Sequence, residues 1–248
     1  MINLRPVRPD DIDQIYAISL LTGDAGKDAT ALHRDGRLIG HIYSAPYAAL
    51  HPEMVFVAED DEGVFGYIAG VFDTVAFEER LEREWWPDLR RRYADPAGDP
   101  ALWDADQRRI SAIHHPKRAP AVLTDPFPAH IHMNLLPRAQ GKGVGTALLE
   151  RWMANARANG VKGVHLGANS GNHGGIRFWS SRGFLPVELP PSLASETTYG
   201  SASLSKSVDL QALTASPPAA LLFAPIWLAT HHSVTDWSRV DGRCKRSR

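Results

Sequence analysis

The chain has 248 residues, a formal net charge of −1 at pH 7 and one cysteine. This length can bury a full hydrophobic core, and the near-neutral charge argues against a nucleic-acid or acidic-membrane partner. A lone cysteine excludes an internal disulfide framework, and the longest apolar run, over residues 219–229, is too short to span a bilayer, so we expect a cytoplasmic protein.

The first 73 residues predict a strand, helical segments and a β-hairpin. A short strand is expected over residues 2–5, followed by a helix that starts at Asp10 or Asp11 and stops near Gly23. A further helical segment over residues 29–50 should break at a glycine and a proline. The strings "MVFVAED" and "VFGYIAGVFD" are rich in β-branched and aromatic residues, and the "DEG" between them favours an antiparallel hairpin.

Residues 74–129 look like a helical insertion between two strands. Apolar residues recur every four positions over residues 77–93, which predicts a helical stripe that Pro87 kinks or divides. A short helix is expected over residues 104–115. A Pro-rich connection then leads into a strand at 130–136.

The second half alternates strands and helices. After the strand at 130–136 come a glycine-rich loop, a helix, the strand "VKGVHLGA", the helix "NHGGIRFWSSRG" and the strand "FLPVEL". This order indicates an α/β protein. We expect one domain over residues 1–190, one last strand within 191–204, and a weakly ordered tail over 205–248.

Three glycines, Gly141, Gly143 and Gly145, stand directly before the helix that follows the strand at 130–136. Glycines there let successive N–H groups turn toward one point, where the positive end of the helix dipole adds to them. A phosphate or pyrophosphate suits such a place. The spacing fits neither the P-loop nor the GxGxxG dinucleotide fingerprint, which disfavours a nucleotide-binding oxidoreductase.

The string that does fit is QxxGxG, made by Gln140, Gly143 and Gly145. It resembles the pyrophosphate loop of the Gcn5-related N-acetyltransferase (GNAT) superfamily, and "VKGVHLGANSGNHGGIRFWSSRGF" continues that superfamily's order of a strand, an Asn, an aromatic pair and a GF turn. The resemblance covers roughly residues 1–190. It implies an α/β (α+β) protein with the GNAT fold: a mixed central sheet of six or seven strands, flanking helices, and the helical insertion between the third and fourth strands.

A narrower resemblance is carried by four short strings, "TGDAGKDAT", "SAPYAALHPE", "GYIAGVFDT" and "AHIHMNLLP". They look like the bacterial acetyltransferases that are similar to the C-terminal acetyltransferase-like domain of O-GlcNAcase. Similarity of fold does not by itself certify activity.

The superfamily resemblance implies acetyl-CoA as a substrate and an amine of a small molecule or a protein as its acceptor. The backbone N–H of Leu135 or Leu136 is expected to bind the thioester carbonyl. No metal is expected, because the paired histidines lack partners at ligand spacing. The sequence leaves the oligomeric state open, a homodimer included. The expected contacts with the coenzyme are Leu135, Leu136, Gln140, Gly141, Lys142, Gly143, Val144, Gly145, Thr146, Asn172 and Trp179.

Two residues that the resemblance would supply for catalysis are absent. Trp179 stands where the superfamily has the tyrosine that protonates the thiolate, and an indole N–H is not such a donor. Asn134 stands where the narrower group often has an acidic residue, and an amide cannot act as a base. Catalysis is therefore assigned to Asp73 at a strand end and to His132, which shares a strand face with His130, with Asn134 beside them.

Alternatives remain for these residues and for the function. Asp73 could cap a helix or turn, and the histidines could be half-buried strand residues. The protein could also act only by positioning its two substrates. The leading hypothesis is an acetyl-CoA-dependent N-acetyltransferase. The alternative is a catalytically silent GNAT-fold module that binds coenzyme A or a partner protein.

Overall fold

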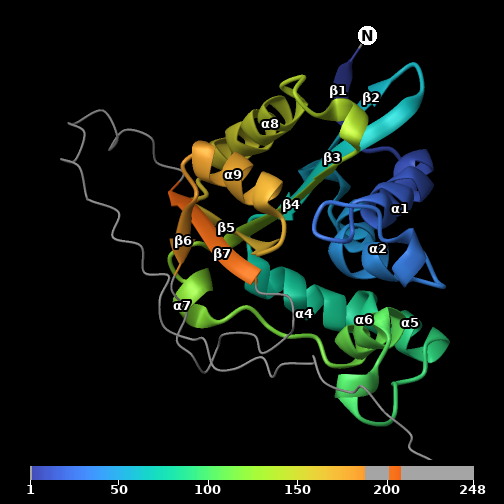
Figure 1. Cartoon of the computed structure of the whole chain (residues 1–248). Coiled ribbons are helices and arrows are strands. Elements are labelled where there is room, and N and C mark those ends of the chain that lie inside the picture. The colour runs from blue at the N-terminus through green and yellow to red at the C-terminus, as the bar shows by residue number, and fades with distance from the viewer. Residues whose placement is uncertain (1, 188–200, 208–248) are drawn as a thin grey trace, which may run out of the picture. The chain divides into compact units, whose positions relative to one another are not determined.

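A computed structural model describes residues 2–187 and 201–207 (Figure 1). These residues form a seven-stranded sheet in the order β1-β2-β3-β4-β5-β7-β6. Neighbouring strands are antiparallel except β4 and β5, which are parallel. The predicted mixed sheet of six or seven strands is confirmed. The strands are β1 (Asn3–Pro6), β2 (Val55–Asp60), β3 (Gly63–Val71), β4 (Ala129–Leu135), β5 (Gly163–Asn169), β6 (Leu185–Val187) and β7 (Ser201–Ser207).

Helices cover both faces of the sheet (Figure 1). One face carries α8 (Val144–Ala158) and α9 (His173–Ser181), whose apolar residues join a core with residues of β2 to β5. The second core, on the other face, is built with residues of the first five helices and α6. The remaining helices are α1 (Ile12–Leu21), α2 (Leu38–Tyr43), α3 (Ala45–Leu50), α4 (Thr74–Glu84), α5 (Trp86–Arg92), α6 (Ala105–His114) and α7 (Ala121–Thr124), with single 3-10 turns at Pro9–Asp11, Thr30–Leu32, Pro52–Met54, Pro100–Leu102 and Pro137–Ala139. In the described residues no helix is both long and apolar enough to cross a membrane.

The insertion between β3 and β4 is helical, as predicted. Pro87 occupies the first turn of α5, so it starts a second helix rather than kinking the first. Phe77, Leu81 and Leu89 of the predicted stripe are buried in the second core. The insertion thereby packs against α1 to α3 instead of forming a core of its own.

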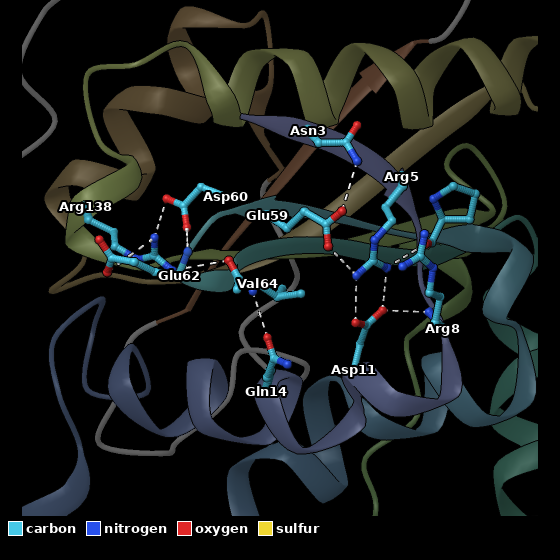
Figure 2. Close-up of polar contacts among 12 residues, drawn as sticks. Asn3, Arg5, Arg8, Asp11, Gln14, Glu59, Asp60, Glu62, Val64 and Arg138 are labelled. Atoms are coloured by element: carbon cyan, nitrogen blue, oxygen red, sulfur yellow. Dashed lines mark hydrogen bonds and ion pairs between the residues drawn. The ribbon is translucent and has the colours of Figure 1, made fainter. Parts of the chain in front are cut away.

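Arg5 of β1 forms ion pairs with the N-cap residue of α1 and with a residue of β2 (Figure 2). Its guanidinium donates to both carboxylate oxygens of Asp11, at 2.6 and 2.9 Å, and to Glu59 at 2.6 Å. Asp11 stands at the N-cap of α1, where a cap was predicted, but its side chain makes no capping bond to that helix. The carboxylate is held instead by Arg5 and by the backbone N–H of Arg8.

The end of the described chain differs from the predicted tail. Strand β7 lies between β5 and β6 and pairs with β5 along all seven residues, from Ser201 to Ser207. The tail predicted to begin at residue 205 is therefore wrong for 205–207. A last strand is expected within 191–204, and β7 overlaps that range but continues to Ser207. The serine-rich sequence gives no signal for the end of the strand, because the pairing comes from backbone hydrogen bonds on both sides. Residues 188–200 and 208–248 lie outside the described residues.

Candidate active site

Strands β4 and β5 are paired at one end and unpaired at the other. Their parallel register has two partners only, Ala129↔Val164 and His130↔His165, although β4 continues to Leu135. The remaining backbone groups on that edge of β4 have no ladder partner on β5 in the described residues. An unpaired run of this kind offers donors to a ligand at the carboxyl end of the two strands.

The register on the other side of β4 decides which amides face this unpaired edge. Leu136 donates its N–H to the carbonyl of Phe65 at 2.9 Å, so it points toward β3. Directions alternate along an antiparallel strand, which turns the N–H groups of Leu135 and Met133 away from β3 and toward β5. The prediction for the Leu136 amide is wrong, because that group closes the ladder. Met133 is a second donor that sequence reasoning missed.

The glycine loop leads from β4 into α8. Gly141 and Gly143 both have φ of +73°, and a Cβ at either would meet no atom within 4 Å. Gly143 is the N-cap of α8, and no side chain of the described residues caps this end of the helix. The first N–H groups of the 15-residue helix, from Val144 onward, thus have no side-chain acceptor there, and a helix end of this kind suits an anion. The loop fits a phosphate group.

The third glycine, Gly145, is needed for close packing and not for a positive φ. A Cβ at Gly145 would lie 3.1 Å from Leu135 Cδ1, 3.3 Å from Phe178 and 3.4 Å from Met133. The start of α8 can therefore lie directly against the C-terminal half of β4. This places the open helix end next to the unpaired amides of that strand.

Arg138 secures the turn that precedes the loop. It forms ion pairs with Asp60 and Glu62 and donates to the carbonyl of Gly63 at 3.3 Å, which attaches Pro137–Ala139 to the β2–β3 turn (Figure 2). The positive charge of Arg138 is therefore paired with acidic side chains. Its contacts hold the strand end and the loop in place.

Other polar side chains lie around the loop. Lys142 is exposed and lines a cavity of about 260 Å³ with the acidic β2–β3 turn, and Gln140 is exposed. Arg182 donates to the hydroxyl of Thr146 in the first turn of α8, and its guanidinium lies 5.2 Å from the centre of the Phe178 ring. Arg182 adds a positive charge beside the helix end, which sequence reasoning did not assign.

Asn172 and Trp179, both predicted to contact the coenzyme, have roles within the fold. Asn172 is the N-cap of α9, and its side-chain oxygen accepts from the N–H of Gly175 at 2.8 Å. The Trp179 ring is 7% exposed and packs edge-on against Phe178 and Phe184. Their contacts with a coenzyme remain predictions.

Asp73 lies at the wrong end of the sheet for a base at Leu135. Its carboxylate caps α4 by accepting from the N–H of Ala76 at 3.0 Å. It follows Val71, which pairs with His130, whereas Leu135 pairs with the start of β3. Five residues of strand correspond to roughly 17 Å. The predicted catalytic position of Asp73 is corrected to a helix cap, because antiparallel pairing sets the end of β3 beside the beginning of β4.

His130 is a buried structural residue. Thr74 donates its single hydroxyl hydrogen to Pro128 O at 2.6 Å, so its oxygen accepts from Nδ1–H of His130 at 2.9 Å. Nε2 then accepts from the Tyr47 hydroxyl at 2.6 Å. Burial holds the pKa of His130 well below its ordinary value, so the ring stays neutral.

His132 lies on the same face but makes no hydrogen bond within the described residues. Its ring centre is 5.3 Å from that of Tyr47, 5.7 Å from that of His130 and 5.8 Å from that of Tyr43. The side chain is partly exposed. Desolvation, aided by the nearby His165, lowers the pKa of His132 to about 4. At neutral pH it is an imidazole with a free lone pair.

Asn134 fastens β4 to its neighbours. Its amide nitrogen donates to the hydroxyl of Thr22 at 2.6 Å, and its oxygen accepts from the hydroxyl of Tyr67 at 3.0 Å. The end of α1 is thereby attached to the strand next to the unpaired amides. Both ends of the Asn134 amide are occupied in this arrangement.

The buried histidines predict a fold that loses stability in mild acid. Burial lowers the pKa of His41 to about 4 and also lowers that of His165. The unfolded chain therefore binds more protons below its ordinary histidine pKa, and stability that is complete above about pH 6.5 falls as the pH decreases toward 4. Each such histidine should lower the free energy of unfolding by about 1.4 kcal/mol for each pH unit of decrease in this range.

Urea denaturation between pH 7 and 5 measures this slope. His41→Gln should reduce it by the equivalent of about one proton. An identical slope for the wild type and the variant would show that His41 titrates alike in both states.

The sequence and the fold were compared with known proteins. Residues 30–184 match the model of the Acetyltransferase (GNAT) family. The chain is 24% identical over 184 residues to Protein O-GlcNAcase of Rattus norvegicus and of Mus musculus, a stretch that makes up 74% of this chain. It spans 20% of the length of these relatives.

Solved structures agree with this match. The crystal structure of SsHAT superposes with a TM-score of 0.74 at 31% identity and covers 84% of this chain and 98% of that one. A crystal structure of an acetyltransferase with 15% identity superposes with a TM-score of 0.51, over 84% of this chain and all of that one, which supports the fold alone. The glycine loop, the divergent β4 and β5 and the family match over residues 30–184 establish that the chain belongs to the GNAT family of acetyltransferases.

Proposed function

We propose that the protein is an N-acetyltransferase that takes an acetyl group from acetyl-CoA and transfers it to an amine. The observation that carries this proposal is the uncapped N-terminus of α8 behind Gly141 and Gly143, next to the unpaired amides of β4. One place attracts phosphate, and the other supplies donors for a carbonyl oxygen. Membership of the GNAT family supports acetyl-CoA as the acetyl donor.

The donor side uses backbone groups. The N–H groups of Val144, Gly145 and Thr146 would bind the pyrophosphate, helped by the charge of Arg182. Lys142 and Gln140 are exposed beside it and free to approach a phosphate from solvent. Because these contacts are mostly main-chain, the loop depends on its glycine conformation more than on side-chain identity.

The transfer itself uses the unpaired edge of β4 toward β5 and the face of β4 that carries His132. The N–H of Leu135, with that of Met133, would stabilise the oxyanion that forms when the amine attacks the thioester carbonyl. His132 would accept the proton of the amine, directly or through a water, since it is neutral at pH 7. The C–S bond then breaks as the amide forms, and the thiolate takes up the proton held by His132 or one from solvent. Asn134 would hold the strand end in position.

Two measurements test the proposal. Calorimetry should detect acetyl-CoA binding, and thiol release over a panel of amines should detect transfer. No binding at high micromolar acetyl-CoA would contradict the proposed donor. Binding without transfer to any amine would instead favour a catalytically silent module, an alternative suggested by the buried Trp179 in place of a tyrosine.

Asp73→Ala separates a helix cap from a catalytic residue. The lost cap of α4 should lower the free energy of unfolding by about 1 kcal/mol and leave the rate of transfer within about twofold. Asp104→Ala is the matched control, because Asp104 caps α6 by the same kind of bond, to Gln107 N–H at 2.8 Å. A tenfold slower transfer for Asp73→Ala alone would return Asp73 to the active site.

A further inference from the structure

Arg109 of the insertion contacts Tyr43, which in turn lies near His132 on β4. Arg109 lies on α6, and its Nη1 donates to the hydroxyl of Tyr43 on α2 at 3.1 Å. The guanidinium carbon lies 5.4 Å from the centre of the Tyr43 ring. Tyr43 also lies near His132, since the centres of the two rings are 5.8 Å apart. The Tyr43 ring thus has both a guanidinium and the neutral imidazole as neighbours.

The charge of Arg109 is not neutralised by a neighbour. Within residues 2–187 and 201–207 no carboxylate lies within ion-pair distance of it, whereas Arg90 on α5 binds both oxygens of Glu82 at 2.8 and 3.1 Å. The bond to Tyr43 uses one of five N–H donors. Arg109, Tyr43 and His132 are all partly exposed, so the remaining donors can meet a ligand.

We propose that Arg109 and Tyr43 bind a carboxylate of the amine acceptor. This inference rests on the proposed transfer, with His132 next to the reacting amine. A guanidinium has the fork geometry that matches a carboxylate, and the stacked Tyr43 ring would keep the fork oriented. The insertion would therefore select the acceptor.

The spacing also restricts the acceptor. The His132 ring and the Arg109 guanidinium lie 5.8 and 5.4 Å from the centre of the Tyr43 ring, so an acceptor that bridges them along this ring is expected to be longer than an α-amino acid, in which the amine and the carboxylate share one carbon. An acceptor that fits has several bonds between the two groups, as in an ω-amino acid or in free lysine reacting at its side-chain amine. The structure thus favours small carboxylate-bearing amines of this length over simple alkylamines.

Matched acceptors test this inference. Wild-type protein should acetylate 6-aminohexanoate at least about 10-fold more efficiently, in kcat/KM, than its neutral amide 6-aminohexanamide or than glycine, which is the expected scale for a charge-assisted contact. Arg109→Gln should lose that preference by slowing the acid alone. Arg108→Gln is the control, because Arg108 is its neighbour on α6, is exposed and, within the described residues, has a single side-chain hydrogen bond, to the carbonyl of Ala101 at 3.4 Å. Equal slowing of acid and amide, or no change, would overturn the inference.

A binding measurement keeps the inference separate from the proposed function. Calorimetry of 6-aminohexanoate and its amide is carried out on protein saturated with coenzyme A, for the wild type and both variants. Tight binding of the acid that depends on Arg109, without transfer to any amine, would support the carboxylate site and contradict the transferase. Transfer without preference for the acid would support the transferase and contradict the carboxylate site. Failure of the acid to bind or react would overturn the inference.

Discussion

Gly143→Val is expected to lower the affinity for acetyl-CoA by at least about 100-fold while the protein stays folded. Gly143 adopts a φ of +73°, which a β-branched residue rarely adopts, and its N–H and that of the next residue begin the open end of α8. Valine would either move the loop out of this conformation or project methyl groups toward the predicted pyrophosphate. Calorimetry with acetyl-CoA measures the loss.

Gly160→Val is the matched control for this substitution. Gly160 follows the other end of the same helix, has a φ of +70°, and would also place a Cβ with no atom within 4 Å. Both variants should be destabilised by about 1–2 kcal/mol, since each forces an L side chain into left-handed backbone. Only Gly143→Val should lose acetyl-CoA binding. Equal affinities for the two variants would mean that the loop is not the pyrophosphate site.

Local patterns in the sequence were enough to predict most of the elements. The stripe of Leu148, Leu149, Trp152, Met153 and Ala156 predicts α8, and all five residues are buried in the core on its face of the sheet. Gly160 ends that helix at positive φ, as its position suggests. These features depend on neighbours three to five residues apart, which periodicity reports directly.

The errors at the site arise from strand pairing. Whether the N–H of Leu135 or of Leu136 is available depends on the register between β3 and β4, and a shift of one residue exchanges them. Asp73 ends the strand that the sequence predicts, two residues after the observed end of β3, but only the antiparallel pairing shows that it lies near the first residues of β4. Periodicity within a strand contains neither fact.

Contacts between distant segments were also beyond prediction. Arg109 and Tyr43 are 66 residues apart, and their contact exists because the insertion packs against α2. Asn134 binds Thr22 over 112 residues. Such contacts follow from the tertiary arrangement of helices around the second core, and no spacing in the chain reports them.

Strand β4 divides the proposed reaction between its two faces. Met133 and Leu135 face the core of α8, next to the loop for the donor. The other face presents His132 toward Tyr43 and Arg109, from elements that precede the strand in the sequence. In the proposed reaction the acetyl-CoA site would therefore be built from β4, the glycine loop and α8, and the choice of acceptor would depend on the insertion.

His132→Ala is expected to reduce the rate of acetyl transfer by about 100-fold or more, within the usual range for loss of a general base, without weakening acetyl-CoA binding. Its ring makes no hydrogen bond in the described residues, so little of the fold depends on its nitrogens, in contrast to His130. Steady-state kinetics at saturating acceptor and calorimetry measure the two quantities. An unchanged rate would leave direct attack, with the protein acting only by positioning its substrates.

The pH dependence of the same variant identifies the base. A base must be unprotonated, and the pKa of His132 is lowered to about 4, so the rate should hold down to about pH 5 and fall as the pH passes through 4. The ratio of wild-type to variant rates cancels the ionisation of the acceptor.

His41→Gln is the control, because burial lowers the pKa of His41 to about 4 as well, while its ring forms a hydrogen bond with Tyr16 on α1 at 2.8 Å. If His132 is the base, the wild-type rate divided by the His132→Ala rate falls with a midpoint near pH 4. The wild-type rate divided by the His41→Gln rate stays constant. Tryptophan fluorescence checks that each protein is folded at each pH. A midpoint near 6.5 would instead require an imidazole that water reaches freely, which the surrounding Tyr43, Tyr47 and His130 rings oppose.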